Sequence, residues 1–292
     1  MNWIIFAIAS AVFVAITTVI EKKTLIKQHA AKFSTTLALF NVLISLIYIP
    51  FVDFGISWQA IFFIFVASIF GSVAFLFLAK GIRHTEVSIS SPLLNFGPAV
   101  TALLAFILLG EIITGWQILG IGVLIVGTYV LEVDHHPRHL LEPFKKMLKS
   151  KYIMFIFFAI LLYGLSGIMD KYILTEFKLN IYTFLFFVHI FVAIIFLLIM
   201  SVYYGGIKEI ASGLKSLWKY VGLIAILVTL ARLSYLQAVS LTFVSLVVPI
   251  KRLSTLLVTI FGGTFFHEKG LPLKIIGCII MLIGVFFLVF PF

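Results

Sequence analysis

The sequence has 292 residues, of which 63% are hydrophobic and 11% are charged. Soluble domains are about 45–50% apolar and about 25% charged, so this composition excludes both an ordinary soluble domain and a disordered chain. The formal charge of +10 fits loops that face anionic lipid headgroups, and we expect no nucleic-acid partner. Cys278 is the only cysteine in the sequence, which excludes an intrachain disulfide.

Apolar runs long enough to cross a bilayer recur along the chain. Because lipid offers no partner to an unpaired peptide group, and the runs are long and uniformly apolar, we expect helices rather than barrel strands. The predicted spans are 2–20, 33–52, 57–79, 85–109, 113–132, 152–170, 180–203, 217–240, 243–266 and 271–290. The first run lacks the basic start and cleavage site of a signal peptide, so we expect it to be retained. The fold class is therefore all-α integral membrane, with ten transmembrane helices in the cell (inner) membrane.

The two halves of the chain carry matching residues in one register. Val87, Ser88, Pro92, Glu111, Gly120 and Gly127 correspond to Val244, Ser245, Pro249, Glu268, Gly277 and Gly284. Because each half has an odd number of spans, the second half enters the membrane from the opposite face. We predict two inverted-topology five-helix repeats, at 1–132 and 152–292, joined by a basic linker at 133–151. Such repeats place a substrate site near the bilayer midplane, between the halves.

A known family shares these features. The stretch 91–113 begins Ser91-Pro92-Leu93 and ends Gly110-Glu111-Ile112-Ile113, and Gln117-Ile118-Leu119-Gly120 follows. It resembles the signature of EamA-type members of the drug/metabolite transporter superfamily, and the stretch from Pro249 through His267-Glu268-Lys269 is similar. The resemblance implies a secondary transporter with a central cavity and with the spans 113–132 and 271–290 outside it. It implies no particular substrate.

Three basic side chains are predicted to lie deep in the membrane: Lys251, Arg252 and Arg232. An ionised group at the bilayer centre costs about 2.5–3.5 kcal/mol on insertion scales, so we expect these groups to face protein, water or a bound anion. No acidic residue is predicted at comparable depth, which favours an anion or a carboxylate-bearing zwitterion as the ligand. The alternative is that Lys251 and Arg252 only pair with carboxylates and lock the fold. Ile250-Lys251-Arg252-Leu253 is also similar to the Lys-Arg pair with which sugar-phosphate translocators hold an anion.

Several polar residues accompany these cations. Thr255 shares a helix face with Arg252, Tyr235 follows Arg232, and Ser91 and Asn95 share a face of the span 85–109. We predict that all four line the substrate site. For Tyr235 an interfacial position is an equal alternative, and Ser91 and Asn95 could simply link helices.

Other polar residues are predicted to have structural roles. His189 and Asn41 are isolated polar groups in apolar spans and are expected to be packing residues. We expect the matched glycines Gly120, Gly127, Gly277 and Gly284 to form close helix contacts.

Four acidic residues occupy corresponding positions in the two halves. Glu21 and Asp170 end the spans 2–20 and 152–170, where either could gate the cavity or carry a coupling proton. An ordinary interfacial salt bridge is the alternative that we favour. Glu111 and Glu268 are predicted to cap the amides that begin the spans 113–132 and 271–290.

These observations favour a secondary active transporter of a small polar metabolite that bears a carboxylate or phosphate, such as an amino acid or organic anion. We expect a monomer or weak homodimer, in contact with lipid and a small-molecule substrate, with a coupling proton as an option. No cofactor is expected, and metal binding by His135, His136 and His139 is disfavoured. The sequence contains no Walker loop, nucleophile elbow or His-Glu-x-x-His motif, so we expect no enzyme activity. The alternatives are proton-coupled efflux of drugs or cationic solutes, and a non-transport accessory of a lipid-carrier flippase.

Overall fold

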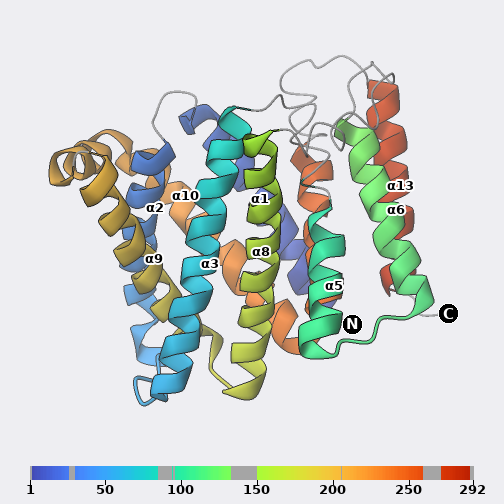
Figure 1. The fold of residues 1–292 in the computed structure, drawn as a ribbon, viewed down its shortest axis with the longest axis horizontal. Coiled ribbons are helices and arrows are strands. Elements are labelled where there is room, and N and C mark those ends of the chain that lie inside the picture. The colour runs from blue at the N-terminus through green and yellow to red at the C-terminus, as the bar shows by residue number, and fades with distance from the viewer. Residues whose placement is uncertain are drawn as a thin grey trace.

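The protein is described by a computed structural model that covers residues 2–25, 30–84, 94, 96–132, 150–204, 206–258 and 271–289. Within these residues the secondary structure is all-helical. The helices are α1 (Asn2–Leu25), α2 (Ala30–Ser45), η1 (Leu46–Phe51, a 3-10 helix), α3 (Trp58–Arg83), α5 (Gly97–Leu109), α6 (Gly115–Glu132), α8 (Lys151–Glu176), α9 (Ile181–Tyr203), α10 (Ile207–Leu241), α11 (Val244–Lys251) and α13 (Leu271–Val289). They run side by side as one bundle (Figure 1).

Length and hydropathy identify membrane spans in this bundle. Of the helices in the described part of the chain, six contain a stretch long and apolar enough to cross a membrane. These stretches lie in α1, α2 with η1, α3, α8, α9 and α10. Shorter apolar helices, α5, α6 and α13, complete the bundle. Helices satisfy every peptide group internally, which is why apolar sequence of this kind adopts them in lipid.

The predicted span 243–266 is not one continuous helix. α11 ends at Lys251, Arg252 forms a turn, and residues 253–258 are again helical. Pro249 lies inside α11 and has no N–H group, and Arg252 N donates to Pro249 O at 3.0 Å in a tightened turn. The regular helix is therefore interrupted at its two cationic residues.

α6 and α13 pack closely against each other at one edge of the bundle (Figure 1). A Cβ atom placed on Gly120 would lie 2.8 Å from Gly284 O, and one on Gly127 would lie 2.7 Å from Met281 N. Only glycine allows the two backbones to approach this closely. The close helix contacts expected of these glycines are present, and they join α6 to α13.

Candidate functional site

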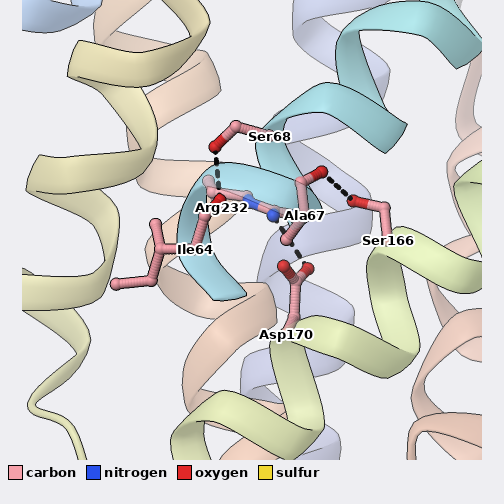
Figure 2. A network of polar contacts seen from close by, with 6 residues as sticks. All are labelled: Ile64, Ala67, Ser68, Ser166, Asp170 and Arg232. Atoms are coloured by element: carbon pink, nitrogen blue, oxygen red, sulfur yellow. Dashed lines mark hydrogen bonds and ion pairs between the residues drawn. The ribbon is translucent and has the colours of Figure 1, made fainter. Parts of the chain in front are cut away.

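An ion pair lies in the middle of the bundle. Asp170 Oδ2 on α8 is 2.8 Å from Arg232 Nη2 on α10, and the two side chains are 1% and 28% exposed. One turn before Asp170, Ser166 Oγ donates to Ala67 O of α3 at 3.3 Å, as Figure 2 shows. Next to it on α3, Ser68 Oγ donates to Ile64 O at 2.8 Å. The pair therefore joins α8 to α10 beside α3.

This pair corrects the prediction that no acidic residue lies as deep as the three cations. Asp170 was expected to end its span, but α8 continues to Glu176. A helix can carry a carboxylate deep into a membrane protein when a cation neutralises it, and Arg232 does so here. The salt bridge that we favoured for Asp170 exists, although it is buried rather than interfacial.

Tyr235 lies between two of the cations. Arg232 Cζ is 5.2 Å and Lys251 Nζ is 4.6 Å from the centroid of its ring. The tyrosine is buried, so the electron-rich faces of the ring stabilise positive charge in a place with little water. Lys251 is also the last residue of α11, where the negative end of the helix dipole favours a cation.

Arg252 reaches across to the start of α5. Its Nη2 atom donates to Leu94 O at 3.1 Å. The same atom lies 2.9 Å from the position that a Cβ atom on Gly97 would take, so a larger residue at position 97 would require the Arg252 side chain to shift. The turn in the chain after α11 is thereby connected to the first turn of α5.

A cavity of about 280 Å³ adjoins these residues, and we call it the cationic chamber. It is lined from α1, α5, α8, α10 and α11 and from the turn after α11. Its described charged lining residues are Asp170, Arg232, Lys251 and Arg252. One carboxylate against three cations leaves this lining positive. α6 and α13 contribute no described residue to it, as the family resemblance implied.

Of the predicted site residues, Lys251, Arg252, Arg232 and Tyr235 line the cationic chamber together with Asp170. Ser91 and Asn95 lie outside the described residues, as do His135, His136 and His139. Thr255 does not line the chamber, and Ser254 does so instead, because the turn at Arg252 changes which face of the chain points inward. Glu21 lies within α1, which continues to Leu25, and lines neither this chamber nor the next one.

A second cavity, of about 330 Å³, lies on the other side of the ion pair, and we call it the lateral chamber. It is lined from α2, α3, α8, α9 and α10. Four residues line both chambers: Tyr163, Ser166, Asp170 and Arg232. Asn41 and His189, which were predicted to be packing residues, both line the lateral chamber. His189 Nδ1 is within 3.1 Å of Tyr48 Oη.

Glu111 has a structural role, but it caps a different helix from the one predicted. Its Oε1 accepts from Val244 N at 2.9 Å, and its Oε2 accepts from Ser245 N at 3.1 Å and from Ser245 Oγ at 2.6 Å. The carboxylate therefore caps the start of α11, where the amides have no partner within the helix. Glu111 lies just before α6 in the sequence, which favoured α6 as the capped helix. In the fold its carboxylate instead contacts the first amides of α11.

The start of α6 is capped by its own residues. Thr114 N donates to Gln117 Oε1 at 2.9 Å, and Gln117 N donates to Thr114 Oγ1 at 3.3 Å. This reciprocal pair is a capping box, and Thr-x-x-Gln is visible in the sequence, so it could have been predicted. Glu268, the counterpart of Glu111, lies outside the described residues.

Lys171 caps the end of α10. Its Nζ donates to Val239 O and to Thr242 O, each at 2.9 Å. A cation is favourable at a helix C-terminus, where the last carbonyl groups are free and the dipole is negative. Lys171 and Asp170 are adjacent but point to different partners, which no sequence pattern indicated.

The fold and the charged cavity define a polytopic helical membrane protein with an internal polar chamber. The model of the EamA-like transporter family matches residues 1–133 and 150–290, so the chain belongs to this family, within the drug/metabolite transporter superfamily. Its members are transporters and not enzymes. No curated protein matches the sequence significantly. A crystal structure described only as that of a protein is similar with a TM-score of 0.77 and 11% identity, over 99% of this chain and 96% of its own. At that identity, the likeness concerns the fold alone.

Proposed function

We propose that this protein is a secondary active transporter of a small metabolite bearing a carboxylate or a phosphate. The observation that carries the proposal is the cationic chamber, in which Lys251, Arg252 and Arg232 face one carboxylate, Asp170. Asp170 is engaged by Arg232, whereas Lys251 contacts the ring of Tyr235. A bound anion would supply the missing negative charge close to Lys251, in a low-dielectric site where this attraction is strong.

The break at Arg252 supports this assignment. Transporters of small solutes often interrupt a helix at the substrate site, because the interruption presents polar groups to a cavity that an unbroken apolar helix cannot offer. Here the interruption places Lys251 and Arg252 at consecutive positions on the wall of the chamber. Arg252 also contacts Leu94 O at the start of α5, so the anion site adjoins both segments.

We further propose that the two segments matched by the family model, 1–133 and 150–290, are inverted repeats that rock against each other. Support comes from the matching residues in the two halves and from the chamber, which is lined from both. The protein would act in the cell membrane, as a monomer or weak homodimer, with a proton as an optional coupling ion.

Ligand-induced thermal stabilisation of the purified protein tests the proposal. Acetate, amino acids, dicarboxylates and sugar phosphates are compared with lipophilic cations, for the wild type and for Lys251→Gln. We expect anions to raise the unfolding temperature of the wild type and not of Lys251→Gln. Lys219→Gln removes one charge from an exposed position of α10 and is the matched control, which should respond as the wild type does. Stabilisation by lipophilic cations alone would overturn the proposal and favour cation efflux.

Liposomes with an imposed pH gradient then test transport itself. The anion that stabilises best should accumulate in liposomes that contain the wild type and not in those that contain Lys251→Gln. Binding without any flux would point to the non-transport accessory role.

A further inference from the structure

The lateral chamber differs in character from the cationic chamber. Much of its wall is apolar, from the side chains of Leu37, Phe75, Val188, Val192 and Phe196. It lies between α2, α3 and α9, on the far side of the Asp170–Arg232 pair from Lys251. Because the residues of that pair line both cavities, a molecule bound in one chamber adjoins the other.

Two polar side chains in the lateral chamber each have a buried oxygen atom without a hydrogen-bond partner among the described residues. Asn41 on α2 is 9% exposed and Ser72 on α3 is 2% exposed. Within the described parts of the chain, neither Asn41 Oδ1 nor Ser72 Oγ has a hydrogen-bond partner. Leaving a buried polar atom unpaired is unfavourable, so such atoms in a cavity wall are positioned to meet a polar group of a ligand.

Apolar walls with a few convergent polar groups are characteristic of a small-molecule site. A chamber of about 330 Å³ is within the size range of such sites, roughly 300–1,000 Å³. Asn41 Oδ1 accepts hydrogen bonds, and Ser72 Oγ both donates and accepts them. The complementary ligand group is therefore a hydroxyl or an amide on an otherwise apolar body.

We propose that the lateral chamber binds the apolar body of the transported anion, and that Asn41 and Ser72 recognise a hydroxyl or amide on that body. This inference rests on the proposed function, because the anionic group of the same molecule would lie against Lys251 and Arg252. The substrate class is then an amphiphile, such as a carboxylate or phosphate monoester with an aliphatic or aromatic body, rather than a fully polar metabolite.

Affinity measurements in lipid nanodiscs test the proposal with a homologous series of probes. Acetate, butyrate, hexanoate and octanoate are compared with the terminally hydroxylated acids of the same lengths. Each buried methylene should strengthen binding about fourfold until the chamber is full. A terminal hydroxyl that reaches Asn41 and Ser72 should add about fivefold at one chain length. If acetate binds and the longer acids bind no better, the lateral chamber is not a subsite and the proposed function stands. If no acid binds, and none of the anions in the thermal-stabilisation test stabilises the protein, the proposed function itself fails.

Three variants on α3 separate a subsite from a general loss of stability. Ser72→Leu reduces the space in the chamber and should shift the best-bound acid to a shorter chain, whereas Phe75→Ala enlarges it and should shift the best-bound acid to a longer one. Phe77→Ala removes the same ring from a position that stacks on Phe155, outside the chamber, and should leave the preferred length unchanged. A defect in folding cannot move the preferred length in opposite directions, so equal preferences in all three variants would overturn the proposal.

The Lys251→Gln variant shows whether the lateral chamber holds the apolar body of the anion or an independent lipid chain. If the apolar body belongs to the anion, Lys251→Gln should weaken the binding of every acid by about the same factor, because the carboxylate of each acid loses the same contact. If Lys251→Gln weakens the binding of acetate but leaves that of octanoate unchanged, the chamber takes a lipid chain independently of the anion, which contradicts the proposal.

Discussion

The α6–α13 pair and the charged centre formed by α8, α10 and α11 are both buried helix contacts. Close backbone packing stabilises the first, and electrostatic interactions stabilise the second. In the α6–α13 pair, glycines such as Gly120 and Gly127 bring backbones together, and their contacts are with backbone and apolar side chains. In the charged centre, Asp170, Arg232 and Lys251 are held by opposite charge and by an aromatic ring. The first region should be sensitive to added volume, and the second to unbalanced charge.

The largest effect is expected from Asp170→Asn. Removing one partner of a buried ion pair leaves the other charge uncompensated, which destabilises a protein by about 3–5 kcal/mol. The free energy of unfolding in mixed detergent micelles measures this loss. The double variant Asp170→Asn/Arg232→Gln removes both charges of this ion pair and should recover much of the loss. If the single variant is as stable as the double, charge balance does not govern this region.

The second-largest loss of stability is expected from Glu111→Gln. The carboxylate accepts from two amides and from the Ser245 hydroxyl, and a hydrogen bond to a charged group contributes about 1.5–3 kcal/mol. We expect a loss in that range by the same unfolding measurement. Glu176→Gln, at the exposed end of α8, is the matched control and should be close to neutral. A loss from Glu176→Gln as large as that from Glu111→Gln would contradict the capping role.

Gly127→Val tests whether the close contact between α6 and α13 depends on glycine. A Cβ atom there would lie 2.7 Å from Met281 N, so the helices must move apart. Overpacking of this kind costs about 1–3 kcal/mol. Gly122→Val makes the same change on the same helix, where no neighbouring atom lies within 4 Å of the new Cβ atom. Equal losses for the two variants would show that helix propensity, rather than the close contact, is responsible.

The smallest effect is expected from Tyr235→Leu. The ring faces two cations, and a cation–π contact is worth about 0.5–1 kcal/mol at exposed sites and about 2 kcal/mol or more when desolvated. Tyr235→Phe keeps the ring face and should lose less stability than Tyr235→Leu. If the two variants lose the same amount, the contribution of Tyr235 comes from its hydroxyl or its volume and not from the cations.

Features that depend on one segment were predictable from the sequence. Long apolar runs gave the spanning helices, since hydropathy acts locally, and Gly120 and Gly127 indicated a close helix contact because their spacing places them on one face. The depth of Lys251 within its span likewise predicted a place on the cavity wall.

Features that depend on which helices meet were not predictable. Asp170 is tolerated deep in the bundle only because α10 presents Arg232 to it, and the helix that Glu111 caps is distant in sequence. The lateral chamber needs α2 and α9 to lie together beside α3, so Asn41 and His189 could only be interpreted as packing residues. The turn at Arg252 had a local signal in Pro249, but it takes the fold to show that Ser254 rather than Thr255 then faces inward.

The hydrogen bonds that hold the connection between α10 and α11 limit how this connection can move. Lys171 of α8 donates to the last carbonyls of α10, while Glu111, between α5 and α6, binds the first amides of α11, so both ends of residues 242–243 are held by charged side chains. A short connection that is held at both ends has little freedom to move by itself. We therefore expect residues 242–243 to move together with α8 and with the segment that carries Glu111, rather than to flex independently of them.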